Sequence, residues 1–155
     1  EGTFKLLTEY LTGRGLPTLL FERTKPGLLA INLASMEALR MGARPDLGLE
    51  AIYHRKSLKD KKPSDGLESV EFQVTLFDQL NDREQDRMLR ATLEKIADMQ
   101  GTLNDLIEAW KKGDVKTLDV LLNKEFQEDP NLKELLIDKR NRSWIPQIER
   151  AFHGR

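Results

Sequence analysis

The sequence predicts a mainly α protein that folds as a multi-helix assembly. Apolar residues recur every three to four positions through most of the chain, which is the spacing of one face of an α-helix. Helix-capping residues stand before these segments and glycines stand after them. No strand-like run is long enough to anchor a β-sheet.

The first 42 residues predict two short helical segments and one long helix. Thr3 is the expected cap of a helix that ends near Gly13, and residues 16–23 form a further helical turn. Residues 28–42 are the most apolar helical segment, so we expect them to form the central core helix, which Gly42 closes.

Asp46 follows a turn and is the expected N-cap of a helix that carries Leu49, Ile52 and Tyr53. Residues 56–66 are polar and contain both proline and glycine, so we predict a flexible loop there.

The segment from residue 70 to residue 80 admits two interpretations. Its first half alternates as in a strand, whereas its second half, around Leu76 and Leu80, continues at helical spacing. We favour a helix that Ser69 or Glu68 opens.

Asn81 and Glu84 form the expected capping box of a long helix that runs to residue 112. Gly101 lies within this helix and marks a bend or the close approach of another helix. Gly113 is expected to end it, and Asp114 to cap the short helix that follows.

The most informative segment begins at Asp129, a good N-cap, and Pro130, which suits the first helical position. A stripe at helical spacing follows, which we expect to be buried and which consists of Leu132, Leu135, Leu136 and Ile137. A polar patch beside an aromatic ring comes next, made of Asp138, Arg140, Asn141, Arg142 and Trp144. Such a patch suits the binding of a carboxylate, a phosphate or a metal-bound ligand, and it equally suits a solvated helix end.

The composition is that of a highly charged chain that can still bury a core. Of 155 residues, 39% are hydrophobic and 33% are charged, and the interspersed charges leave a net charge of −1. We therefore expect no nucleic-acid partner. No apolar run approaches the roughly 20 residues that span a bilayer, so no transmembrane segment is expected. We expect residues 1–155 to be a single helical domain, or a fragment of a longer gene product.

Several short motifs, in their order and spacing, resemble those of the TraB/PrgY/GumN family, which includes the Tiki-type proteins. They are FERTKP at 21–26, GARPDLGLE at 42–50, Leu67-Glu68-Ser69, and WKKGD at 110–114 followed by DKRNRSW at 138–144.

The resemblance implies that this chain is the helical central part of a larger α/β fold in a bacterial protein. The intact protein would resemble a metal-dependent hydrolase that cleaves a peptide with Mn, Co or Zn, in the periplasm or cell envelope. The family's two Gly-x-x-His motifs do not occur in this sequence, since His54 and His153 stand in other contexts. The chain alone is therefore expected to be inactive and to hold no cofactor.

Arg140 and Asn141 match the family's motif, and the resemblance implies a catalytic guanidinium at Arg140 and substrate binding by Asn141 and Trp144. The alternative is an ion pair of Arg140 with Asp138, Glu134 or a neighbouring helix, with Trp144 as a packing residue.

Glu68 matches a family glutamate and is the expected general base, and Glu50 is the expected ligand of a hard divalent ion. Both stand next to helix starts, where carboxylates also act as caps, so this alternative stays open.

A second hypothesis is a helical interaction module without catalytic activity. The alternating charges of the helices and the 56–66 loop support it. A large exposed apolar face would favour self-association under either hypothesis.

Overall fold

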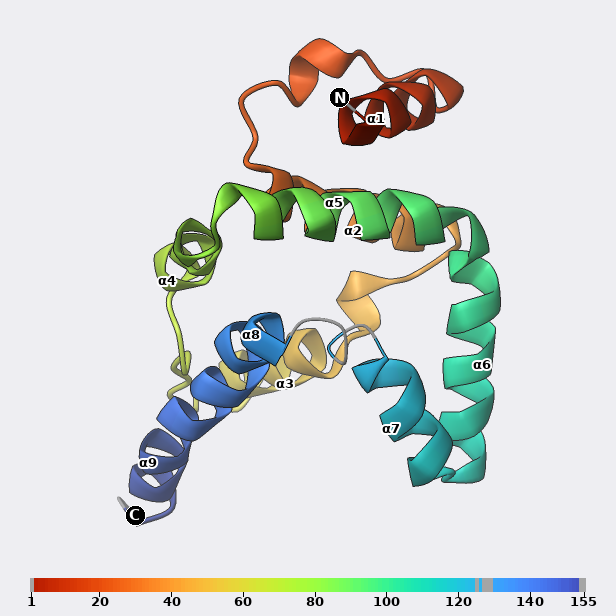
Figure 1. Ribbon diagram of the computed structural model, residues 1–155. Helices are drawn as coiled ribbons and strands as arrows, with labels where there is room; N and C mark the ends of the chain where they lie inside the picture. Colours follow the sequence, from red (N-terminus) through yellow and green to blue (C-terminus); the bar gives the residue numbers. More distant parts are fainter. Residues whose placement is uncertain (1, 125, 127–129, 154–155) are drawn as a thin grey trace. The chain divides into compact units, whose positions relative to one another are not determined.

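The computed structural model describes residues 2–124, 126 and 130–153, and this described part contains helices and no strand (Figure 1). The prediction of a mainly α fold is confirmed. Internal contacts divide the chain into two compact units, residues 1–97 and residues 98–155.

The first unit is built from longer helices joined by short 3₁₀ turns. Its helices are α1 (Gly2–Gly13), α2 (Pro26–Arg40), α3 (Leu49–Lys59), α4 (Val70–Thr75) and α5 (Asp82–Lys95). The 3₁₀ turns are Thr18–Leu20, Pro45–Leu47, Leu76–Gln79 and Ile96–Asp98.

The core of this unit lies where α2 packs along α5 and α1 packs against α5. Leu11 of α1 and Leu33 of α2 are completely buried. The other buried apolar side chains are Leu7, Leu29, Ala30, Leu76, Phe77, Leu80, Leu89, Leu93 and Ile96. Each large side chain buried in this way stabilises the fold by roughly 2 kcal/mol, so this cluster holds the three helices together.

Two of the expected helix caps are wrong. Thr3 lies inside α1 and is buried there, so it does not cap the helix. Asp46 lies in a 3₁₀ turn, where its two carboxylate oxygens accept from Arg44 at 2.9 and 2.8 Å. Gly48 precedes α3 instead, and its carbonyl accepts from the backbone N–H of Ile52.

The helix α3 extends to Lys59, so the first four residues of the expected 56–66 loop are helical. In the 70–80 segment the helical interpretation is confirmed and the strand is wrong. The Ser69 hydroxyl caps α4 by accepting from the Phe72 N–H at 3.1 Å.

The capping box of Asn81 and Glu84 is confirmed, with both of its reciprocal hydrogen bonds present. The expected long helix is nevertheless broken at Ile96–Asp98, ahead of Gly101. A Cβ at position 101 would lie 3.0 Å from a carboxylate oxygen of Asp98. The glycine therefore makes room for the Asp98 side chain, and the α-helical hydrogen bonding is interrupted at Ile96–Asp98, before Gly101.

Gln85 joins three segments of the first unit from inside its core, where its side chain is only 6% exposed. Its Nε2 donates to the carbonyls of Phe77 at 3.2 Å and Leu80 at 3.1 Å. Its Oε1 accepts from the backbone N–H of Gly27 at 3.4 Å. A Cβ at Gly27 would lie 3.0 Å from the Phe77 ring, so the close approach of these segments depends on glycine.

Replacing Gln85 with leucine should destabilise the protein by about 2 kcal/mol, because buried backbone groups would lose their hydrogen-bond partner. Urea unfolding followed by circular dichroism measures this change. The exposed Gln79 is the matched control, and Gln79→Leu should change stability by less than about 0.5 kcal/mol. Equal effects of the two substitutions would contradict the structural role given to Gln85.

The second unit contains α6 (Met99–Lys112), α7 (Val115–Asn123), α8 (Pro130–Lys133) and α9 (Lys139–His153). The first two of these helices pack against each other. Gly113 ends α6 in the left-handed region with φ +66°, and Asp114 caps α7 by accepting from the Thr117 N–H at 3.1 Å. Both of these predictions are confirmed.

The helix predicted after residue 129 begins at Pro130, as expected, and the expected cap Asp129 lies outside the described residues. The stripe that follows is less buried than predicted. Leu132, Leu135 and Leu136 are half-buried, and Ile137 is 37% exposed.

Candidate functional site

The predicted polar patch lies between two irregularities of the helical backbone. A five-residue π-helical turn, Glu134–Asp138, joins α8 to α9 (Figure 1). Pro146 lies inside α9 and has no N–H to donate to the carbonyl of Arg142. Because π-turns occur frequently at functional sites, this bracketed segment is the strongest candidate in the second unit.

Arg140 is held in a defined orientation at the beginning of α9. Its side chain is half-buried, and Nη1 donates to the carbonyl of Leu136 at 2.9 Å. Its guanidinium carbon lies 5.3 Å from the centroid of the Trp144 ring, within cation–π distance. The structure therefore brings together two of the predicted site residues, Arg140 and Trp144.

Asn141, the third predicted residue on this helix, is exposed. The carboxylates that were the alternative partners of Arg140 have other cationic contacts. Asp138 accepts from Lys133, with N–O distances of 3.1 and 3.2 Å, and Glu134 pairs with Arg142.

Glu50 lies in the first turn of α3, exposed, where it lines an open hollow of about 530 Å³. The other lining residues are Tyr53, His54, Ser57, Ser64, Asp65 and Gly66. His54 and Asp65 were not predicted as neighbours of Glu50. The spacing of four residues between Glu50 and His54 on one helix could have predicted that these two side chains are neighbours.

Glu68 is half-buried, immediately before the N-cap of α4, and it does not line this hollow. The alternative role of Glu68 as the cap of α4 is not favoured, because Ser69 occupies the N-cap position. Whether either carboxylate approaches Arg140 stays a prediction.

Within residues 2–124, 126 and 130–153, no group of three or more His, Cys, Asp or Glu side chains could hold a metal ion. The role of Glu50 as a metal ligand stays a prediction.

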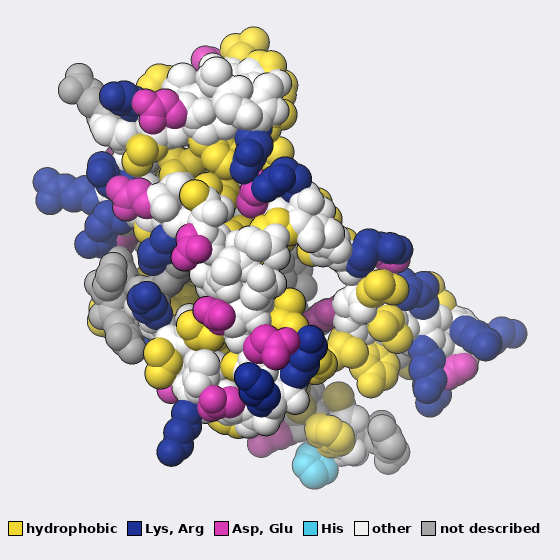
Figure 2. Space-filling view, turned by 90° about the vertical axis from the view of Figure 1, so that its right-hand side faces the viewer, with side chains coloured by type: hydrophobic (Ala, Val, Ile, Leu, Met, Phe, Trp, Pro, Cys, Tyr) yellow, Lys and Arg dark blue, Asp and Glu magenta, His cyan; other side chains and the backbone are white. Residues whose placement is uncertain are grey.

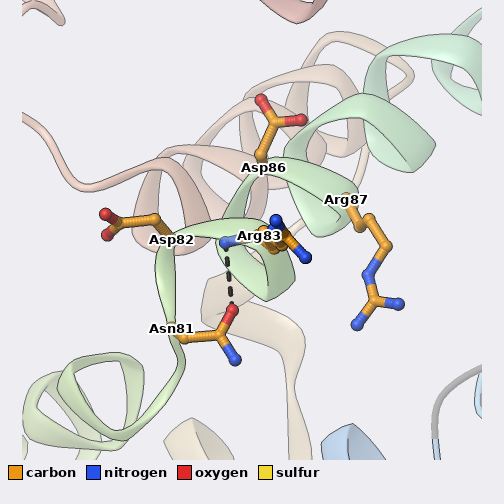
Figure 3. Close-up of a pocket in the computed structure, with 5 residues that line it drawn as sticks. All are labelled: Asn81, Asp82, Arg83, Asp86 and Arg87. Atoms are coloured by element: carbon orange, nitrogen blue, oxygen red, sulfur yellow. Dashed lines mark hydrogen bonds between the residues drawn. The ribbon is translucent and has the colours of Figure 1, made fainter.

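A second open hollow, about 500 Å³ in volume, lies at the beginning of α5 and is lined by Asn81, Asp82, Arg83, Asp86 and Arg87 (Figure 3). The acidic side chains and Arg87 point in different directions in this view. Asn81 Oδ1 accepts from the backbone N–H of Arg83 at 3.0 Å, which is the capping interaction of the helix. We assign no site to this hollow, because its charged groups do not converge.

The sequence interpretation missed a buried carboxylate, Glu37, on the core face of α2. This side chain is 3% exposed and accepts from Arg14 at 3.0 and 3.1 Å, from Tyr10 at 3.2 Å and from Arg40 at 2.8 Å. The hydrogen bond from Arg40 lowers the pKa of Glu37, against the opposing effect of burial and with the help of Arg14. The position of Glu37 four residues after the buried Leu33 could have predicted that the Glu37 side chain is buried as well.

Two further observations concern the surface. Cationic and anionic side chains are interspersed on the face shown in Figure 2, as the net charge of −1 suggests. Among the described residues, no helix combines the length and apolar character needed to cross a membrane.

Comparison with known proteins identifies the family of this chain. The model of the TraB/PrgY/gumN family matches residues 1–155, which confirms the predicted resemblance. No curated protein and no solved structure matches the chain.

Proposed function

Since this chain belongs to the TraB/PrgY/gumN family, we propose that it forms the helical part of a metal-dependent hydrolase that cleaves peptides. The observation that carries this proposal is the orientation of Arg140, which lies against both the Leu136 carbonyl and the Trp144 ring. A location in the periplasm or cell envelope is part of the same proposal.

Arg140 would bind a substrate carboxylate or the oxyanion that forms during hydrolysis. A guanidinium donates several hydrogen bonds in one plane and stays charged, so it suits an oxygen that gains negative charge in the transition state. The contacts to Leu136 and Trp144 restrict its rotamers before substrate arrives, which lowers the entropy cost of binding. Asn141, one position further and exposed, would add an amide donor, and Trp144 an apolar surface.

The carboxylates of the first unit have different proposed roles. Glu68 would act as the general base that takes a proton from water. Glu50 would contribute one ligand of a divalent ion (Mn, Co or Zn). Because the Gly-x-x-His motifs of the family are not in this sequence, residues 1–155 alone should be inactive.

The metal prediction can be tested without an activity assay. Adding Mn²⁺, Co²⁺ or Zn²⁺ to the complete gene product that contains this chain should raise its melting temperature, since a ligand that binds only the folded state stabilises it. The variant Glu50→Gln should show a smaller rise, and Asp60→Asn just after the same helix should behave like the wild type. No rise with any of the three ions would contradict the proposed metal site.

The alternative function is a helical interaction module, and α9 offers an observation in its favour. Ile145, Ile148 and Phe152 of this helix are 53%, 40% and 69% exposed. Such side chains would be covered in a self-associated form. A concentration-dependent mass in sedimentation, together with no hydrolysis of any peptide, would favour this alternative.

A further inference from the structure

A π-turn lies between α8 and α9, immediately before the candidate site. In the turn Glu134–Asp138, the backbone N–H of Lys139 donates to the carbonyl of Glu134, five residues earlier. A regular α-helix would bond that N–H to the carbonyl four residues earlier. Converting the π-turn to α-helix would rotate α9, with Arg140 and Asn141, by about 100° relative to α8.

One ion pair fits the π-turn and does not fit an α-helix. Lys133 Nζ contacts both carboxylate oxygens of Asp138, at 3.2 and 3.1 Å, across five positions of the chain. Residues five apart lie about 140° apart around an α-helix, where their side chains do not meet. The wider turn of a π-helix brings them to one face, so this pair is formed only when the π-turn is present.

Two other side-chain contacts cross the same turn. Arg142 pairs with Glu134 across eight positions, and Arg140 Nη1 donates to the carbonyl of Leu136 within the turn. Arg140, which carries the proposed catalytic guanidinium, is thus one of the α9 residues that contact the turn. The rotational position of α9 and the orientation of Arg140 are coupled through these contacts.

We propose that Lys133 and Asp138 are positioning residues, whose ion pair holds the π-turn and thereby sets the face of α9 on which Arg140 and Asn141 lie. The structural part of this proposal stands on the contacts across the turn. Its consequence for hydrolysis rests on the proposed function.

Through-hydrogen-bond couplings, measured by NMR on isotopically labelled protein, test the structural part. In the wild type the Lys139 N–H should couple to the carbonyl of Glu134. In Asp138→Ala it should couple to the carbonyl of Leu135, and the charge exchange Lys133→Asp with Asp138→Lys should restore the coupling to Glu134. Arg150→Ala, which removes a cation from the same helix, should leave the coupling unchanged. Coupling to Glu134 that persists in Asp138→Ala would overturn the proposal.

Peptide cleavage by the complete gene product separates this inference from the proposed function. Asp138→Ala should lower kcat at least tenfold with a smaller change in KM, and the charge exchange should restore most of it. A changed coupling with unchanged cleavage would support the role of Lys133 and Asp138 in positioning α9. It would refute the catalytic role of Arg140. An unchanged coupling in an active protein would refute the positioning role alone.

Discussion

Replacing Arg14 with alanine should lower the free energy of unfolding by about 1.5 to 3 kcal/mol, the range for a hydrogen bond to a charged group, because Arg14 is itself 36% exposed. Glu37 is 3% exposed and would keep its charge without two of its hydrogen bonds, those from Arg14 at 3.0 and 3.1 Å. Arg40 and Tyr10 would remain as partners, so the loss should not exceed this range. The pair also links the turn just after α1 to α2, so its loss should loosen the attachment of this turn to the first unit.

Chemical denaturation at neutral pH measures this loss, and Arg90→Ala is the matched control. Arg90 pairs with Glu94 at 2.8 Å on α5, where both side chains are 49% exposed. Breaking that exposed pair should cost about 0.5 kcal/mol or less. A loss for Arg14→Ala as small as that of the control would show that the Glu37 cluster contributes little to stability.

The pH dependence of the stability of the wild type and of Arg14→Ala provides a second check. The pKa of Glu37 is lowered in the folded state, chiefly by the hydrogen bond from Arg40. Its contribution to stability is therefore present above the pKa of the unfolded chain and is lost as the pH falls through the folded pKa. The difference between wild type and Arg14→Ala should accordingly narrow below about pH 4, because a protonated Glu37 no longer needs the guanidinium.

Replacing Arg140 with alanine should lower the kcat of peptide cleavage by the complete gene product about 10²- to 10³-fold, the usual cost of removing a donor to the oxyanion. The alanine variant loses the planar donor set and the contact with Trp144, whose ring centroid lies 5.3 Å from the guanidinium carbon. Arg140→Lys keeps the charge without the bidentate geometry, so its activity should be intermediate.

Steady-state cleavage of one peptide by these variants measures the effect, with far-UV circular dichroism to confirm that they fold. Arg150 lies on the same helix, is exposed and carries the same charge, which makes Arg150→Ala the control. It should leave kcat within a factor of about two, as expected for a surface change of less than 0.5 kcal/mol. Equal rates for Arg140→Ala and Arg150→Ala would contradict a catalytic role for Arg140.

The elements that the sequence predicted correctly depend on neighbours along the chain. The capping box of Asn81 and Glu84, the cap at Ser69 and the left-handed Gly113 each involve residues within one helical turn. Asp46 failed as a cap because a competing neighbour, Arg44, takes both of its oxygens.

The Glu37 cluster could be predicted only in part, because Arg40 is a neighbour on the same helix whereas Arg14 and Tyr10 come from a distant part of the sequence. Arg14 is 23 residues from Glu37 and Tyr10 is 27 residues away, and they meet only when α1 and α2 pack in the same unit. A pattern of apolar residues indicates which face of α2 is buried. It does not indicate that the carboxylate of Glu37 accepts hydrogen bonds from Arg14 and Tyr10.

The candidate site was predicted in part for a related reason. Arg140, Asn141 and Trp144 are close in sequence, so their proximity followed from a single helix. The π-turn before them was not predicted, because the spacing of five between Lys133 and Asp138 is not a contact of an α-helix. The approach of Glu50 and Glu68 to Arg140 stays a prediction.

The most direct test of the central claim is peptide cleavage by the complete gene product after its metal has been removed with a chelator. The account predicts no cleavage by the metal-free protein and restored cleavage on addition of Mn²⁺, Co²⁺ or Zn²⁺, with little recovery in Arg140→Ala. Cleavage that continues without metal, or full recovery in Arg140→Ala, would contradict it.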